Sequence, residues 1–452
     1  MSPRLRFSLG LRWDVNPPPD VTQGLKPYTI QGSGPSTWTL APQGAPLWQT
    51  AWYNFAPRLG VAYILHDVPG RETVVRSGGG VFFDTGQQLG SFGFSGPGFS
   101  AQLCCPSGSF PVDGAGLAPV ITNPPTGSNV YVFPSHFQLP YTLQWNSSIE
   151  QAMGKEQALT VSYVGSHAAR LPRYNLIFTP NSRPQFADIY FIQNGLTSDY
   201  DSLQVQFRRR LSRGLTALAS HTWSHCLDYG SQNFGNSFGY RRGNCDFDVR
   251  HNLSAAFSYD LPNVGHNAFA NTVLRHWGFD NRFTVRTAFP VILQGKRLML
   301  SNGQLYNAGV NLVPGQPVYL YGDNCTTTLQ SLGDLTPGQG CPGGRALNPQ
   351  AFTNASSGFG TAPRNFAQGF GAWQMDLAVR REFPIFENLR LQFRADAFNV
   401  FNHPNFGTVN PNVGQRTFGQ ATSTLANSLG TLSPLYQQGG PRSMQFALKI
   451  IF

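Results

Sequence analysis

The sequence predicts an all-β protein, one antiparallel sheet whose strands cross a membrane as a transmembrane β-barrel. Three observations predict this fold. Apolar and polar residues alternate with a period of two over about twelve segments, and the connections between these segments are alternately short and long. Charged residues make up only 12% of the 452 residues, whereas an average soluble domain has about 25%.

The composition argues against crossing the membrane by helices. The chain is rich in Gly (49), Pro (34) and Phe (35), and Gly and Pro disfavour helices. It has no uninterrupted apolar run of the roughly 18 residues that a helix needs to cross about 30 Å of hydrocarbon. A barrel strand alternates lipid-facing and lumen-facing residues, which explains a mean hydropathy near neutral, -0.23.

The alternation defines the strands from the first to the last. From residue 4 to residue 15 the odd positions are all apolar, and the even positions are Arg, Ser, Gly or Asp. Segments of about 10 residues suit a tilted strand that crosses a membrane. We expect strands near residues 3–15, 52–65, 72–84, 140–152, 157–167, 201–211, 215–226, 247–260, 277–291, 372–383, 389–401 and 442–452.

The connections give these strands a direction. Tight joins occur at 66–71, around 154–155, at 212–214 and at 384–388, and a looser one runs from 261 to 276. Outer-membrane barrels place short turns on the periplasmic side and long loops outside the cell. Both the start of the first strand and Phe452 are therefore expected on the periplasmic side. The expected extracellular loops are 16–51, 85–139, 168–200, 227–246, 292–371 and 402–441.

All six cysteines fall in or beside the expected extracellular loops, which suits an oxidising compartment. Cys226 and Cys245 bracket one loop, and Cys325 and Cys341 lie within another, so each pair is a possible disulfide. Each bond would contribute about 3 kcal/mol if it closed a loop of roughly 15 residues. Free thiols are the alternative, and the adjacent cysteines at 104–105 are less suited to pairing.

A metal or cofactor site is not expected. Cys226 could bind a metal together with His221 and His225, but the chain has no paired C-x-x-C, and His221 and Trp223 fit one face of a strand. No catalytic or phosphate-binding motif occurs, so we expect neither enzyme activity nor a cofactor. The segment 248–251 (DVRH) follows a long loop, and we expect it to knit that loop to neighbouring strands in the lumen.

The net charge of +10 does not indicate a nucleic-acid partner. Nucleic-acid-binding proteins gather their cations in a patch or tail, whereas here they are scattered along the strands. The densest run, at 208–210 (RRR), ends an amphipathic strand. Its long side chains can reach headgroups or water at the membrane surface.

Several phrases carry a family resemblance. They are NFAPRLGVAY at 54–63, YDSLQ at 200–204, FDVRHNL at 247–253 and AFNVFNHPNF at 397–406. Together they resemble the C-terminal β-barrel of Oar-like TonB-dependent outer-membrane transporters of the acidobacterial type. The final residues 445–452 are similar to the aromatic-ended signal that the barrel-assembly machinery recognises, and its side chains here are Phe446, Leu448, Ile450 and Phe452.

The resemblance implies a barrel of about 22 strands, a size at which the lumen needs a plug. Relatives carry a signal peptide, often a carboxypeptidase-regulatory-like domain, a TonB box and a plug before the barrel. The present chain enters a barrel strand within a few residues of Met1, so we expect a single domain over 1–452 that corresponds to the C-terminal part of such a barrel, without those segments and incompletely closed.

The resemblance also implies a place in the cell and a set of partners. The expected location is the outer membrane, with membrane lipid, lipopolysaccharide and the barrel-assembly machinery as partners, and with the TonB complex a partner only of full-length relatives. The ligand is not indicated. Two alternatives are a self-contained pore of about twelve strands, which requires the first and last strands to pair, and a soluble extracellular β protein that binds glycans.

Overall fold

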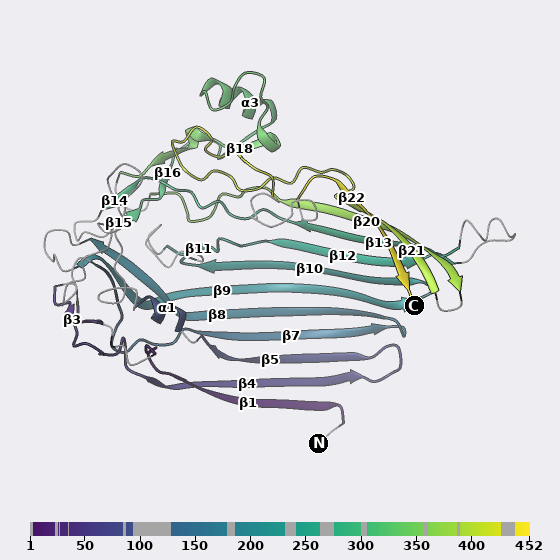
Figure 1. Ribbon diagram of the computed structural model, residues 1–452, viewed down its shortest axis with the longest axis horizontal. Coiled ribbons are helices and arrows are strands. Elements are labelled where there is room, and N and C mark those ends of the chain that lie inside the picture. Colours follow the sequence, from purple (N-terminus) through teal and green to yellow (C-terminus); the bar gives the residue numbers. More distant parts are fainter. Residues whose placement is uncertain are drawn as a thin grey trace, which may run out of the picture.

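The computed structural model describes residues 3–22, 26, 28–34, 36–84, 87–93, 128–178, 186–230, 241–262, 275–299, 305–356, 360–386, 389–425 and 439–452. Its main feature is one large curved sheet (Figure 1). The cysteines at 104–105 and most of the looser join at 261–276 lie outside the described residues. So do residues 387–388 of one tight join.

Twelve strands follow one another in sequence order along this sheet, and each pairs with its neighbours in antiparallel fashion. All twelve predicted strands are confirmed, with ends shifted by a few residues in most cases. They are β1 (Leu5–Asn16), β4 (Ala51–His66), β5 (Thr73–Phe83), β7 (Tyr141–Met153), β8 (Gln157–Phe178), β9 (Phe186–Ser212), β10 (Leu215–Asp228), β12 (His251–Asp260), β13 (Trp277–Arg286), β20 (Ala372–Phe386), β21 (Leu389–Phe398) and β22 (Ser443–Ile451).

The register sorts side chains into an apolar and a polar face. Leu9 of β1 lies opposite Leu59 of β4, and Phe393 of β21 lies opposite Leu448 of β22, so apolar residues meet apolar residues across the ladder. Leu9 is 80% exposed and Leu448 is 70% exposed. A water-facing surface would not carry so many exposed large side chains, and a lipid-facing wall requires them.

Short turns and long connections lie at opposite ends of the strands, as predicted. Both chain ends lie at the turn end of the sheet, on the right in Figure 1. The turn between β9 and β10 has positive φ at Arg213 (50°) and Gly214 (77°), and a Cβ on Gly214 would lie 2.3 Å from the carbonyl oxygen of Asp260. Glycine therefore fits this tight turn beside a third strand.

The prediction of an irregular loop over 168–200 is wrong. Residues 168–178 continue β8 and residues 186–200 begin β9, so this hairpin extends well beyond its membrane-crossing part. The pairing shifts near Arg170 (φ 57°) and Leu171, which interrupts the alternation that a membrane-crossing strand maintains. The extension lies next to β6 (Ser128–Val132), which pairs in parallel with β9.

The other long connections contain short elements that the sequence did not predict. They are β2 (Ile30–Gln31), β3 (Thr39–Leu40), α1 (Gln87–Phe92), β11 (Gly243–Asn244), β14 (Arg297–Met299), β15 (Leu305–Asn307), β16 (Val310–Leu312), β17 (Tyr319–Tyr321), α3 (Gly322–Ser331), η2 (Pro342–Gly344), β18 (Arg345–Leu347), η3 (Pro349–Ala351) and β19 (Phe352–Asn354). Among the described residues, no helix is long and apolar enough to cross a membrane.

The buried cores lie at the loop end, in the long connections and where these pack against β6 and the extension of β9. The largest joins residues 291–367 to Val409 and Phe418, so two long connections pack as one unit. A second core places Trp38 against Val130 of β6 and Ile189 of β9. These apolar contacts, together with the ion pairs described below, hold the loop end of the sheet in a defined shape.

The large sheet is not closed. Among the described strands, β1 pairs only with β4 and β22 pairs only with β21, at opposite margins of the sheet. The predicted open, half-barrel architecture is thus what the structure has. The two marginal strands leave backbone groups that a closed barrel would engage.

Candidate functional site

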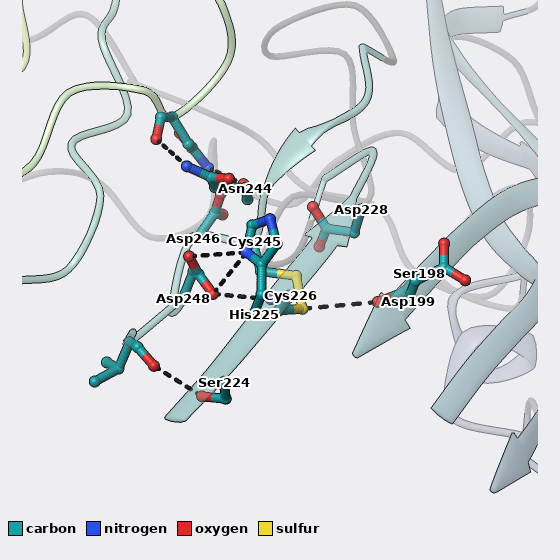
Figure 2. Close-up of a disulfide and its surroundings, with 12 residues drawn as sticks. Ser198, Asp199, Ser224, His225, Cys226, Asp228, Asn244, Cys245, Asp246 and Asp248 are labelled. Atoms are coloured by element: carbon teal, nitrogen blue, oxygen red, sulfur yellow. Dashed lines mark hydrogen bonds and ion pairs between the residues drawn. A yellow bond between two sulfur atoms is a disulfide. The ribbon is translucent and has the colours of Figure 1, made fainter. Parts of the chain in front are cut away.

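A disulfide, histidines and ion-paired side chains lie together at the loop end of β10 and β12. Cys226, at the end of β10, and Cys245, directly after β11, form a disulfide with a Cα–Cα distance of 5.4 Å (Figure 2). Cys226 is 5% exposed and Cys245 is fully buried. Two backbone hydrogen bonds, from Cys245 to Cys226 and from Asp248 to Cys245, fold the returning chain over the strand end.

Asp248 links this returning segment to β10. Its carboxylate accepts a hydrogen bond of 2.8 Å from the backbone N–H of Cys226, and it lies 3.3 Å from His225 and 3.2 Å from Arg250. The side chain is only 2% exposed, so these partners compensate for its desolvation. Asp248 and Arg250 therefore knit the loop to the neighbouring strand, as predicted.

His251 does not take part in that network. It lies on the apolar face, where its ring stacks on His221 at a centroid distance of 5.5 Å and on Trp223 at 6.4 Å. The expectation that His251 would lie in the lumen is wrong, because the alternation at the start of β12 places it with Leu253. Cys226 is bonded to Cys245, and no group of three metal-binding side chains occurs within the described residues.

A buried arginine joins this region to the longest connection. Arg364 lies 2.5 Å from a carboxylate oxygen of Asp228 and 2.7 Å from one of Asp246, and all three side chains are 6–7% exposed. The neighbouring Asn365 donates to the carbonyl of Asn244 and to Asp246 at 2.7 Å. Nothing local in the sequence indicates this cluster, because its members are up to 136 residues apart.

The second predicted cysteine pair stabilises a small outlying unit. Cys325 of α3 and Cys341 form a disulfide with a Cα–Cα distance of 5.8 Å. Cys325 packs with Leu329 and Leu335. Burial raises the pKa of the neighbouring Asp334 carboxyl, and the charge of Arg416 offsets part of this rise. The unit's helix α3 lies at the top of Figure 1, above β18 and away from the large sheet.

A cavity of about 590 Å³ opens on the polar face below these loops. It is lined by polar-face side chains of β9, β10, β12 and β13, and by residues 247–249 and Phe289. Its volume lies in the usual range for small-molecule sites, about 300–1,000 Å³. Arg282 and Arg286 bring positive charge to it, and Asn252, Thr222 and Ser254 bring neutral hydrogen-bonding groups.

Further toward the turn end, the polar face carries an ion-pair array. Asp280 of β13 lies 3.5 Å from Arg380 of β20 and 2.5 Å from Arg394 of β21, and Ser258 of β12 donates to it at 2.7 Å. Arg380 also pairs with Asp260. The array links four neighbouring strands on a face whose charged groups a lipid environment would not accept.

The four residues of the predicted assembly signal all lie on the apolar face. Their exposed fractions are 67% for Phe446, 70% for Leu448, 56% for Ile450 and 95% for Phe452. Recognition by the assembly machinery stays a prediction. The geometry supplies the alternating apolar surface that such a signal needs.

Comparison with known families agrees with these two faces. A family model described as the outer membrane beta barrel domain matches residues 1–445. The chain belongs to this family. As an outer membrane beta barrel domain, it has the outer membrane as its location and membrane lipid as its surroundings, which accounts for the exposed apolar face. Comparison with curated proteins gives no match.

Solved structures similar to this outer membrane beta barrel domain come from several bacteria. The outer membrane transporter YddB from Escherichia coli is 10% identical, with a TM-score of 0.49, and 88% of this chain and 40% of that chain are covered. The ferric-catecholate import receptor Fiu from Escherichia coli is 10% identical, with a TM-score of 0.43, and 99% of this chain and 42% of that chain are covered. The FrpB iron transporter from Neisseria meningitidis is 11% identical, with a TM-score of 0.44, and 99% of this chain and 43% of that chain are covered. The chain spans less than half the length of each.

Proposed function

We propose that this chain forms about half of the wall of a TonB-dependent outer-membrane receptor, which admits a ligand through its lumen when a plug is displaced. The proposal assigns no catalytic step to the chain. The observation that carries it is the open sheet, in which β1 and β22 each have one partner among the described strands. The Oar-like phrases at 54–63 and 397–406 support the family assignment.

The polar face has the features that a lumen wall needs. Charged and hydroxyl side chains cover the face opposite the apolar one, and the ion-pair array around Asp280 holds four strands together. The packed connections and the Arg364 cluster build a fixed rim at the loop end of the wall. A ligand arriving from outside would meet this rim first, and a plug beside the wall would control its passage.

The test asks whether the sheet closes on itself. Cysteines introduced by Ser8→Cys on β1 and Ala447→Cys on β22 would lie at opposite margins. The pair Ser8→Cys and Gly60→Cys serves as the positive control because these residues are direct partners. We expect the control pair to cross-link in the refolded chain, and the margin pair not to cross-link within one chain.

Gel migration adds an independent readout. A closed barrel resists dodecyl sulfate and migrates differently before and after boiling, and we expect the refolded chain to show no such shift. A shift together with a cross-link between the two margins would overturn the proposal in favour of a self-contained pore of twelve strands. Failure to enter lipid vesicles at all would favour the soluble glycan-binding alternative.

A further inference from the structure

The cavity on the polar face differs in charge from the rest of that face. Of its described lining residues, only Asp248 has a carboxylate, and Asp248 is buried and held by Arg250 and His225. Arg282 and Arg286 line the same cavity. The ion pairs among the described residues include neither of these two arginines, whereas Arg380 and Arg394 nearby are both paired. The cavity therefore carries two arginines that form no ion pair within the described part of the chain.

The surroundings of the two arginines show why this charge is available. Arg286 donates from Nη1 to the carbonyl of Thr287 at 3.1 Å and lies 4.1 Å from the ring centroid of Phe289, and neither partner is anionic. Arg282 faces Asp376 across the ladder, and that carboxylate accepts hydrogen bonds from the neutral Gln374 and the backbone of Asn399. The carboxylate partly offsets the charge of Arg282, so Arg286 is the arginine best placed for a ligand. Arginine suits the planar two-point recognition of a carboxylate.

The rest of the lining suits a polyhydroxyl ligand. Thr222, Asn252 and Ser254 present hydroxyl and amide groups from adjacent strands, and such groups hydrogen-bond to hydroxyls. Phe247 is 54% exposed and Phe289 is 38% exposed, although both line a cavity on the polar face. Exposed rings at such a site offer apolar surfaces for the C–H face of a sugar ring.

We propose that this cavity binds an acidic saccharide, with a carboxylate of the ligand on Arg286 and its ring against Phe289. Arg282 and Arg286 lie four residues apart on one strand, about 13 Å, so they can contact acidic groups on different units of an oligosaccharide. This inference rests on the proposed function in that the cavity would be the point of ligand entry. Binding itself requires neither a plug nor TonB.

The probe is a trimer of galacturonic acid, and its fully methyl-esterified form is the uncharged control. Binding is measured by calorimetry on the full chain, refolded in detergent, at low and at physiological salt. We expect the acid trimer to bind at least tenfold more tightly than the ester, with affinity falling as salt rises. Arg286→Gln should weaken the acid trimer at least tenfold, since a charge-assisted hydrogen bond is lost.

Arg58→Gln is the matched control variant. Arg58 is also a polar-face arginine over a phenylalanine, 4.5 Å from the ring centroid of Phe82, but it lies outside the cavity. We expect Arg58→Gln to bind the trimer like the unchanged chain, and Phe289→Ala to weaken the acid and ester forms alike. Far-ultraviolet circular dichroism and protection of the four disulfide cysteines from alkylation confirm that each variant is folded.

Four results would overturn the proposal. The acid trimer and its ester could bind with equal affinity, or tri-glutamate could bind as tightly as the acid trimer, which would indicate an acidic peptide site. Arg286→Gln could bind the acid trimer as tightly as the unchanged chain, or the unchanged chain could fail to bind the trimer at millimolar concentration. None of these results bears on whether β1 and β22 pair, so the wall proposal stands or falls separately on the cross-linking experiment.

Discussion

The face assignment of β22 gives the sharpest quantitative prediction. The strand has nine residues, and Ala447 is its midpoint on the polar face, next to Leu448 on the apolar face. With a rise of about 3.3 Å per residue and a tilt of about 40°, neighbouring residues differ by only about 2.5 Å in depth. Leu448→Arg and Ala447→Arg thus place the same charge at nearly the same depth on opposite faces.

The expected costs differ because lipid solvates a guanidinium poorly. Leu448→Arg should lower the free energy of unfolding by about 2–4 kcal/mol, the usual cost of Arg at a bilayer midplane. Ala447→Arg should cost less than about 1 kcal/mol, because its side chain lies on the polar face, where water can reach it and screens its repulsion from Arg394 across the ladder. The predicted difference of at least about 1 kcal/mol corresponds to at least about a fivefold change in the folding equilibrium.

The assay is urea unfolding of the chain refolded in phosphatidylcholine vesicles, followed by tryptophan fluorescence. In vitro refolding separates the membrane effect from recognition by the assembly machinery, in which Leu448 has a predicted role. A larger cost for Ala447→Arg than for Leu448→Arg would show that the faces are reversed. Costs below about 0.5 kcal/mol at both positions would show that β22 does not lie in lipid.

Three further predictions concern the loop end. Without reduction, Cys226, Cys245, Cys325 and Cys341 should resist alkylation in the denatured chain, and a mass increase at any of them would refute the corresponding disulfide. Arg364→Met should take from the buried carboxylates of Asp228 and Asp246 the cation that pairs with both, destabilise the joined loops by about 3–5 kcal/mol and speed limited proteolysis there. Adding Asp228→Asn and Asp246→Asn should restore much of the resistance, and no restoration would argue against the ion pairs. The pKa of Asp334 is raised in the folded state, so the unit held by the Cys325–Cys341 disulfide should lose stability as pH rises from the ordinary aspartate range through that raised pKa. Hydrogen exchange of residues 319–347 should show this loss of stability. Asp334→Asn should remove the pH dependence.

The membrane-crossing part of the fold could be predicted because one physical rule governs each strand there. Lipid on one side and water on the other enforce strict alternation, as in residues 4–15, and each of the twelve predicted strands was found. Beyond the membrane that rule no longer applies. The extension of β8 and β9 therefore escaped prediction, since one of its faces packs against loop residues such as Trp38 instead of lipid, and Pro172 follows a shift in pairing.

The candidate site could be predicted only where partners lie close in sequence. The disulfide pairs are separated by 19 and 16 residues, so compartment and spacing indicated them. Arg364 meets Asp228 across 136 residues, and Arg282 reaches the same cavity as Thr222 only through the sheet. Such clusters follow from strand order and loop packing, which no local pattern encodes.

The placement of the two disulfides affects the order in which the molecule can be made. One bond closes a ring from the end of β10 into the connection to β12, and the other closes a ring within the connection between β13 and β20. Neither bond ties two connections together. Oxidation of these four cysteines therefore leaves every strand free to pair with its neighbour. The disulfides are therefore compatible with formation before the sheet enters the membrane, because neither of them restricts how successive strands pair during assembly.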